Sequence, residues 1–495
     1  MKRIALAALA ALLGLAAVLL IRAASLESRQ VEVAPVPVYE VDAKPLAQRL
    51  ALAIRLRTIS NQDRSQPDRQ AFRDFSRLLE SYYPAAHRQI SVERVNGPSL
   101  LYTWRGRNPQ LDPVLLAAHH DVVPVDPDSA AEWVHPPFAG VVADGFVWGR
   151  GAIDDKGSVI TIMDAVESLV AEGFQPERTV YLAFGHDEEV GGNDGALAMA
   201  KLLESRGVRL EWVLDEGGVV AEDFVPGVDL KVAVVGIAEK GGVSIGLEID
   251  APGGHSSTPP PHTAIGELAR VVAQLEDRQM PGRIDGVTGV FLDTVAPELS
   301  LGARLVLANR WLFGPVLRWG FLQVPPLAAM TRTTTAVTIF ESGVKENVLP
   351  VRARAVVNFR IHPRDRVEDV VAHVRETIDD ERVRLQVGVR TPPREPSPVS
   401  PVESQAYDDL QRAIRSVFPS AIVTPYLVVG GTDSRHYYRI SDNVYRFGPF
   451  ILGRETMRLA HGTNERISVD NLVNAVRFYR QLLITSVGPD QPSSE

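Results

Sequence analysis

The chain has 495 residues and a formal net charge of −9 at pH 7, with 45% hydrophobic and 23% charged residues. Because a single hydrophobic core rarely serves more than about 250–300 residues, this length predicts two folded domains, and the negative charge without a basic run argues against nucleic-acid binding. The chain has no cysteine, which excludes disulfides and thiolate metal sites, so any metal ion must be bound by His, Asp and Glu.

An apolar segment follows the basic residues Lys2 and Arg3 at the start of the chain. It covers residues 4–21, IALAALAALLGLAAVLLI, and is followed by Arg22. A membrane-spanning helix needs about 17–25 such residues, and a usual signal-peptide core has only about 7–15. The segment therefore predicts a signal anchor over residues 1–25, with the basic start in the cytoplasm and the bulk of the chain on the extracytoplasmic side. The alternative is a cleaved signal peptide and a secreted or periplasmic protein.

An α/β domain is predicted over residues 46–240 and 392–495, after a polar, proline-bearing tether at 26–45. Segments with the apolar spacing of helices alternate with short apolar runs that are typical of buried strands. Helices are expected at 70–84, 158–173, 195–207, 406–418 and 467–487, and strands at 114–123 and 179–189. This order predicts a central, mostly parallel sheet with helices on both faces.

Residues 241–391 have a different texture and predict a separate α+β domain inserted into the first. Strands are expected at 241–250, 333–343, 352–361 and 382–389, and a helix at 366–378. Within this insert, residues 302–330 are rich in Leu, Trp and Phe, and arginines supply their only charges. Two interpretations of this stretch stay open: buried helices and loops of the inserted domain, or an apolar surface that faces a membrane or an acyl chain.

The apolar run LLAA at 115–118 ends in two histidines and an aspartate. Open α/β sheets bind their ligands just beyond the carboxyl ends of the strands. Because strand side chains alternate between faces, His119 and Asp121 should point one way and His120 the other. A single His-x-Asp pair is also explained by an imidazole that is satisfied by a neighbouring carboxylate, so the other predicted strand ends must decide.

Further strand ends also carry carboxylates, and a late loop carries a histidine. Asp154 and Asp155 precede a helix, where a lone carboxylate would be interpreted as an N-cap. The other positions are HDEE at residues 186–189, Asp215 with Glu216, and His461. Each of them alone is explained by capping or by a solvated loop. Together, their mutual repulsion requires a cation, which imidazole nitrogens and carboxylate oxygens would bind.

The ordered motifs resemble those of the M20 metallopeptidases, specifically the branch of carboxypeptidase S and N-acyl-amino-acid hydrolases. They are HHDVV, GRGAIDDKG, DEEVGG, LDEGG, GGHSS, NFRIHP, GGTDSRHY and AHGTNE. The resemblance implies a di-zinc aminopeptidase-like catalytic domain, an inserted lid or dimerisation domain, and two Zn²⁺ ions per subunit. The implied metal ligands are His119, Asp154 as the bridge, Glu189, Asp215 and His461. Asp215 is preferred at its strand end, and Glu216 is the alternative.

The same resemblance implies roles for residues around the metal ions. Asp121 would hold the His119 imidazole in its metal-binding tautomer, and Glu188 would be the general base for a metal-bound water that attacks an amide carbonyl. The oxyanion and substrate contacts would be His255, Asn347, Arg360 and Thr432, with Gly431 beside them. In the family a histidine like His255 often comes from the partner subunit or arrives by lid closure, which leaves room for a homodimer.

The implied reaction is hydrolysis of an amide bond next to a C-terminal amino acid, in an N-acyl amino acid or a short peptide. The membrane segment and the apolar stretch 302–330 favour a long acyl group as part of this small-molecule substrate. The acyl group would pack against Trp311, Leu312, Phe313, Trp319 and Phe321. A dipeptidase of the same family and a non-catalytic binding protein with this fold are the alternatives.

Two patterns of other enzyme classes are weaker. GVSIG at 242–246 matches the serine-hydrolase pattern G-x-S-x-G, but Ser244 lies inside a predicted strand, not at a strand-to-helix turn. GRGAID at 149–154 begins like a dinucleotide-binding loop, but it lacks the final glycine and continues into acidic residues. Neither pattern therefore competes with the metal site.

Overall fold

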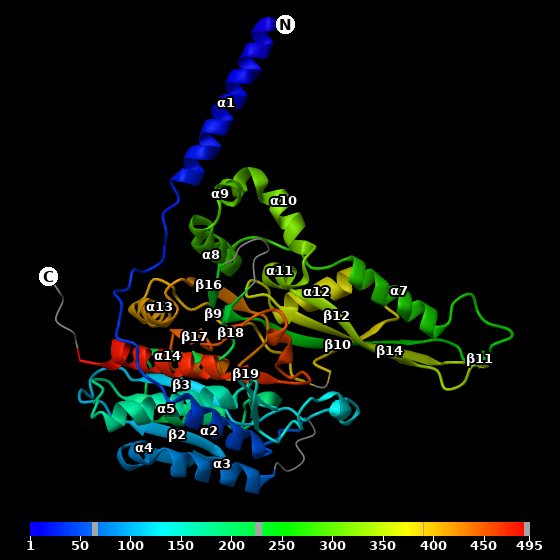
Figure 1. Cartoon of the computed structure of the whole chain (residues 1–495). Coiled ribbons are helices and arrows are strands. Elements are labelled where there is room, and N and C mark those ends of the chain that lie inside the picture. Colours follow the sequence, from blue (N-terminus) through cyan, green and yellow to red (C-terminus); the bar gives the residue numbers. More distant parts are fainter. Residues whose placement is uncertain (62–67, 223–229, 390, 490–495) are drawn as a thin grey trace. The chain divides into compact units, whose positions relative to one another are not determined.

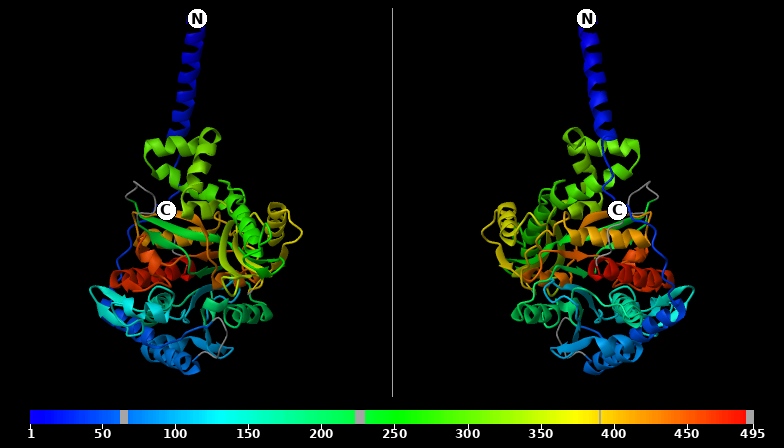
Figure 2. Two further views of the ribbon diagram at one scale, coloured as in Figure 1. Left: turned by 90° about the vertical axis from the view of Figure 1, so that its right-hand side faces the viewer. Right: turned by 90° about the vertical axis from the view of Figure 1, so that its left-hand side faces the viewer.

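The computed structural model describes residues 1–61, 68–222, 230–389 and 391–489, and the chain divides into two compact units (Figure 1, Figure 2). Unit 1 comprises Met1–Glu27, Ala238–Val399 and Leu427–Gly431. Unit 2 comprises Ser28–Ile237, Ser400–Tyr426 and Thr432–Glu495. The segment 241–391, which was predicted as an insert, therefore lies inside unit 1.

A large mixed sheet forms the centre of unit 2. Its described strands follow the order β1 (Ser91–Val95), β2 (Ser99–Trp104), β6 (Val180–Gly185), β3 (Val114–His119), β7 (Trp212–Asp215), β17 (Val444–Arg446), β9 (Val232–Glu239), β8 (Val219–Ala221) and β18 (Ile451–Leu452), and β16 (Ile422–Val428) pairs with β9. The central strands β6, β3, β7 and β17 are parallel, whereas β1, β2 and β9 pair antiparallel at the margins. The predicted α/β class is confirmed, with a sheet that is parallel at its centre and between β8 and β18 at one end.

Helices cover this sheet because its strands are apolar on both faces. Leu115 and Ala117 of β3 pack with Met199 of α6 and Tyr437 of η4, and Leu116 faces the other side, where α5 contacts β3. The helices and 3₁₀ helices are α2 (Ala43–Arg55), α3 (Arg69–Tyr82), α4 (Pro84–Gln89), η1 (Pro127–Glu132), α5 (Lys156–Ala171), η2 (Glu188–Val190), α6 (Ala196–Ser205), α13 (Gln405–Val417), η4 (Asp433–Arg439), η5 (Thr456–Leu459) and α14 (Val469–Val487). Strands β4 (Val141–Ala143), β5 (Phe146–Trp148) and β19 (Arg466–Ser468) form a small separate sheet.

Unit 1 contains an antiparallel sheet with one apolar face. The described strands follow the order β12 (Thr334–Ser342), β14 (Arg352–Ile361), β10 (Gly241–Asp250) and β15 (Arg384–Val387). Alternate residues of β10 and β14 are buried against α7 (Ala264–Asp277) and α12 (Val367–Ile378). Two short strands, β11 (Gly254–His255) and β13 (Val348–Leu349), pair beyond one end of this sheet (Figure 1). Ser244 lies inside β10, as predicted, so it is not the serine of a nucleophile turn.

Unit 1 also contains a further group of helices. They are α1 (Lys2–Ala24), α8 (Gly286–Val295), η3 (Ala296–Glu298), α9 (Leu301–Ala308), α10 (Arg310–Leu322) and α11 (Pro325–Thr331). Of these, α8 is largely buried and α1, α9 and α10 are largely not. Both α9 and α10 are described in full, and no residue of either is buried. The interpretation of 302–330 as buried helices is therefore wrong for these two helices. Both helices are partly covered, since α9 contacts α1 and η3 and α10 contacts α11, but Trp311, Leu312, Val316 and Trp319 of α10 stay exposed.

Candidate active site

Three neighbouring parallel strands bring polar residues to one edge of the large sheet. Strand β3 pairs in parallel with β6 on one side and with β7 on the other, so the carboxyl ends of all three meet. Beyond these ends follow His119 with Asp121, Glu188 with Glu189, and Asp215 with Glu216. Asp154 comes from the loop that precedes α5, and His461 from the loop after η5. This edge is the place where open α/β sheets bind ligands.

Asp121 organises the first of these strand ends. The Nδ1 atom of His119 lies 3.1 Å from the backbone oxygen of Asp121 and 3.3 Å from its carboxylate, which leaves Nε2 facing the other acidic residues. The Asp121 carboxylate also accepts the backbone N–H groups of Glu188 and Glu189, both at 3.3 Å. One buried carboxylate thereby fixes both the His119 ring and the turn that carries two glutamates.

His120 points to the opposite face, as the strand alternation predicts. Its ring is fully buried and stacks on Phe75 at 4.9 Å, with Phe72 at its edge. Burial lowers the pKa of His120 to about 3, so the ring is neutral and contributes to the core.

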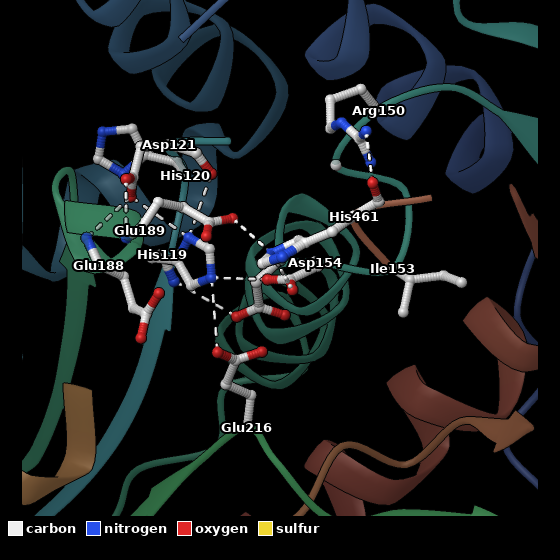
Figure 3. A network of polar contacts seen from close by, with 12 residues as sticks. His119, His120, Asp121, Arg150, Ile153, Asp154, Glu188, Glu189, Glu216 and His461 are labelled. Carbon is white, nitrogen blue, oxygen red and sulfur yellow. Dashed lines mark hydrogen bonds and ion pairs between the residues drawn. The ribbon is translucent and has the colours of Figure 1, made fainter. Parts of the chain in front are cut away.

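Two groups of potential metal ligands share Asp154 (Figure 3). In the first, His119 Nε2 lies 2.9 Å from Asp154 and 3.5 Å from Glu216. In the second, His461 Nε2 lies 3.0 Å from Asp154 and 3.1 Å from Glu189. Within each group the ligand atoms lie within 4.8 Å of one another. One carboxylate between two ligand groups is the arrangement that a pair of metal ions requires.

The preference for Asp215 over Glu216 is not supported by the geometry. Asp215 is the last residue of β7, and its carboxylate accepts the backbone N–H of Ser434 at 2.6 Å. Glu216 comes one residue later and therefore turns to the opposite side, where it faces His119. The alternation of faces along the strand thus favours Glu216 as the ligand, and Asp215 as a residue that holds η4.

A tight turn places Glu188 and Glu189 side by side. The turn is η2, and it closes through Gly191 at φ 110° and Gly192 at φ 65°. At Gly192 a Cβ atom would lie 1.9 Å from a carboxylate oxygen of Asp433, so only glycine fits there. The motif DEEVGG thereby folds so that Glu189 reaches His461 while Glu188 stays beside the cluster without being one of its members.

The charges of this cluster match a bound cation. Burial, together with the charge of Asp154, raises the pKa of Glu216 to about 7, and burial also raises the pKa of Glu188 well above its usual range. Hydrogen bonds with Asp154 and Glu189 raise the pKa of His461 to about 10. Without a cation the cluster therefore retains protons that offset its negative charge. A divalent ion would replace those protons, and nitrogen and oxygen donors of this kind suit zinc.

Glu465 is a buried residue that the sequence analysis missed. Its Oε1 atom accepts the backbone N–H groups of Gly151 at 3.0 Å, Ile153 at 2.9 Å and Asp154 at 3.3 Å. Its Oε2 atom accepts a hydrogen bond from Arg150 at 2.6 Å, and Arg150 also donates to the backbone oxygen of His461 at 3.0 Å. The Arg150–Glu465 pair thus fixes both the loop of Asp154 and the loop of His461. The only signal in the sequence was the position of Glu465, four residues after His461.

Of the three residues implied as substrate contacts in unit 1, His255 and Asn347 lie close together and Arg360 lies apart. His255 is on β11 and Asn347 precedes β13; both are exposed and lie beyond one end of the sheet. Strand register pairs Asp250 with Arg352 at that end of the sheet and Gly242 with Arg360 at the other end. The exposed Arg360 therefore lies eight residues, or about 26 Å, from Arg352 along β14. Within one copy of unit 1, His255 and Arg360 therefore cannot contact the same small substrate.

Thr432, the implied substrate contact in unit 2, is buried at the start of η4. Its hydroxyl lies 2.6 Å from that of Ser434, whose backbone N–H holds Asp215. Thr432 is thus tied to the sheet edge that carries the cluster.

Comparison with known proteins identifies the family. The pattern of "Peptidase family M20/M25/M40" matches residues 115–485. The "N-fatty-acyl-amino acid synthase/hydrolase PM20D1" of Xenopus tropicalis is 40% identical over 90% of this chain and 87% of that protein. The "Probable carboxypeptidase S-like 2" of Dictyostelium discoideum is 39% identical over 88% of this chain and 84% of that protein. The M20 family metallo-carboxypeptidase Sso-CP2 of Sulfolobus solfataricus has the same fold, with a TM-score of 0.64 at 19% identity over 90% of this chain and 99% of that chain.

This chain therefore belongs to peptidase family M20/M25/M40, and the predicted resemblance is confirmed. It is a hydrolase of the metallopeptidase type, and membership implies a metal cofactor. The polar cluster at the edge of the large sheet provides a ligand set of the required chemistry.

Proposed function

We propose that this protein hydrolyses the amide bond of N-acyl amino acids with two Zn²⁺ ions at the cluster of unit 2. One ion would be held by His119, Asp154 and Glu216, and the other by Asp154, Glu189 and His461. The observation that carries the proposal is the single carboxylate, Asp154, shared by two groups of ligands. Glu216 replaces Asp215 in the ligand set for the geometric reason given above.

The bound zinc ions would supply Lewis acidity and a water of lowered pKa. Glu188 accepts the proton of the attacking water and then delivers it to the leaving amine. Burial raises the pKa of the Glu188 carboxyl, which makes it a stronger base than an exposed glutamate. Asp121 acts as a positioning residue, since it binds His119 and the backbone of Glu188 at once.

The residues of unit 1 would complete the substrate site. We assign the oxyanion contact to His255 and Asn347, and the substrate carboxylate to Arg360, whose planar guanidinium forms paired hydrogen bonds with such groups. Thr432, beside Gly431, would line the same site from η4. Because Arg360 lies about 26 Å along β14 from Arg352, the end of the strand beyond which β11 carries His255, two copies would share each site, with His255 from one copy and Arg360 from the other. A homodimer is therefore part of the proposal.

The substrate class rests on the relatives. Proteins named N-fatty-acyl-amino acid synthase/hydrolase PM20D1 from Xenopus tropicalis, mouse and human are 38–40% identical to this chain over 84–90% of their own length. An apolar acyl group on an amino acid with a free carboxylate is the substrate that fits both these names and the assignment of Arg360. Carboxypeptidase activity on short peptides is the alternative, because the relatives also include carboxypeptidase S-like proteins.

Helix α1 would anchor the protein in a membrane. It has 23 residues, and its most apolar 18-residue window has a mean hydropathy of 2.9 and no buried residue. Lys2 and Arg3 at its start favour a cytoplasmic N-terminus, which places both units on the extracytoplasmic side. Release after signal cleavage, as a secreted or periplasmic protein, is the alternative.

The test is the hydrolysis of acetyl, hexanoyl, decanoyl and oleoyl derivatives of one amino acid, and of dipeptides, by the full chain in lipid nanodiscs. Free substrate is measured by equilibrium dialysis so that partition into lipid does not distort the rates. We expect kcat/KM to rise with acyl length, by up to about fourfold per methylene from about 0.8 kcal/mol of burial, and chelator to abolish every rate. A flat or falling series with rapid dipeptide cleavage would contradict the proposed substrate class and favour a dipeptidase instead.

A further inference from the structure

Helix α10 presents an apolar stripe to the exterior of unit 1. Its exposed large side chains are Trp311, Leu312, Val316 and Trp319, which are 59%, 40%, 66% and 66% exposed. They lie one, four and three residues apart and therefore share one face of the helix. Two tryptophans and two aliphatic side chains on one helical face exceed the scattered exposed apolar residues of an ordinary surface.

The sequence of this region carries charges of one sign, and the acidic residue Asp293 of α8 pairs with Arg310 at the start of α10. From Leu299 to Phe340 the sequence has no aspartate or glutamate, and it has four arginines, at positions 304, 310, 318 and 332. Arg318 is exposed on α10 between Val316 and Trp319. Exposed tryptophan with arginine and without acidic residues is the composition of segments that lie in the interfacial layer of a membrane.

Helix α1 ends against these same helices. Arg22 donates a hydrogen bond to the backbone oxygen of Ala308, the last residue of α9, at 3.3 Å. Asn309, which precedes α10, donates to the backbone oxygen of Leu19 at 3.1 Å. Both views of Figure 2 show the C-terminal end of α1, in blue, beside the light-green helices of residues 301–322. The membrane-spanning candidate and the exposed stripe are therefore joined at α9.

The length of α1 determines where this joint lies. At about 1.5 Å per residue its 23 residues extend about 35 Å, little more than the about 30 Å of a bilayer core. The whole helix is needed for the crossing, so its last turn must lie at the membrane surface. Arg22 is the charged residue that such a helix end places among lipid headgroups. Atoms that are hydrogen-bonded to this turn lie at the same depth.

We propose that α9 and α10 form a second membrane contact, in which the stripe of α10 inserts into the boundary between headgroups and acyl chains beside α1. This inference rests on the anchoring role proposed above for α1. It goes beyond that role, since a single spanning helix would leave unit 1 free to rotate about the axis of α1. With α10 inserted, unit 1 is held at two places and takes one fixed orientation at the surface.

Spin labels test the inference in the full chain reconstituted in phosphatidylcholine vesicles. The chain has no cysteine, so a single introduced cysteine is the only labelling site. Val316→Cys reports on the stripe, Leu12→Cys on the middle of α1, and Val344→Cys, at a residue that is 93% exposed elsewhere in unit 1, is the aqueous control. The measured quantity is the collision rate with oxygen, which concentrates in lipid, relative to that with a water-soluble nickel chelate.

We expect the oxygen-to-chelate ratio at position 316 to exceed that at position 344 several-fold and to approach that at position 12. An aqueous ratio at 316 with a lipid ratio at 12 would overturn the second contact and leave the anchor intact. If neither oxygen nor the chelate reaches the label at position 316 and its spectrum shows spin–spin broadening, a second copy of the chain covers the stripe. If the label becomes protected from both reagents only after an N-oleoyl amino acid is added, the stripe is a substrate site. Either result would overturn the inference. An aqueous ratio at position 12 would overturn the anchor as well.

Discussion

The metal cluster of unit 2 and the implied substrate contacts of unit 1 are held in opposite ways. Each ligand in the cluster is fixed within unit 2, since Asp121 binds His119 and Glu465 binds the loop of Asp154. The side chains of His255 and Arg360 are exposed. The comparison indicates that metal binding is prepared inside one chain, whereas substrate binding needs a further element.

The largest effect on this comparison is expected from Glu188→Gln. The variant removes the proton carrier and keeps the fold and the metal ligands, so kcat should fall by about 10²–10⁴-fold while bound zinc stays unchanged. Rates are measured together with metal content by mass spectrometry. Glu93→Gln on the exposed strand β1 is the matched control. Near-native turnover with full metal content would remove Glu188 from its proposed role.

His255→Ala should lower kcat by about 10²–10³-fold and change KM little, because an oxyanion donor acts mainly in the transition state. Mixing this variant with Glu188→Gln should restore activity if His255 serves the site of another copy. His262→Ala, an exposed histidine of the same segment, is the control. Loss of activity that mixing does not restore would show that His255 reaches the site of its own chain, and a rise in KM alone would make it a binding residue.

Glu216→Gln and Asp215→Asn compare adjacent residues at the end of β7. Loss of a residue that is hydrogen-bonded to a metal ligand lowers metal affinity by about 10–100-fold, and removal of a ligand itself should lower zinc affinity at least as much. Asp215→Asn keeps an oxygen that accepts the N–H of Ser434, so its effect should be smaller. Affinities are determined by competition with a chelating dye. The reverse order would restore Asp215 as the ligand.

Glu465→Gln should lower zinc affinity by about 10–100-fold, because the loops of Asp154 and His461 lose their common partner. Breaking one side of a buried ion pair should also reduce the free energy of unfolding by about 3–5 kcal/mol. Arg150→Gln should reduce the free energy of unfolding less in the Glu465→Gln variant than in the native chain, because the two residues act as a pair. The exposed Glu455→Gln is the control. Additive losses would show that Arg150 and Glu465 act independently.

The smallest effect concerns the pH dependence of metal binding. In the metal-free protein the pKa of Glu216 is raised to about 7 and that of His461 to about 10, so at neutral pH zinc must displace a proton from His461 and from about half of the Glu216 carboxyls. Apparent affinity should therefore rise between pH 6 and 8, by up to about tenfold per pH unit for each displaced proton. Calorimetry in buffers of different ionisation enthalpy counts the protons released. An affinity independent of pH would contradict the assigned ligands.

The sequence predicted those parts of the site that depend on neighbouring residues and on the ends of parallel strands. Alternation along β3 placed His119 and His120 on opposite faces, and the meeting of parallel strands gathered the acidic segments. Asp215 and Glu216 could not be separated, because a single residue at the strand end decides which one faces His119. Glu465 was missed because its partners are backbone groups at residues 151–154, more than 300 positions earlier. Composition alone also could not tell whether α10 was core or surface.

The position of β17 in the large sheet governs how the chain can fold. This strand lies between β7 and β9, yet it comes from residues 444–446, after the whole of the 238–399 stretch of unit 1. Until it is synthesised, β7 has an unpaired edge in the middle of the sheet, which is a template for aggregation. Such non-local pairing makes folding slow. During synthesis the edges of β7 and β9 must therefore stay unpaired until β17 is made. Nascent chains that stop before residue 444 should depend on chaperones for their solubility.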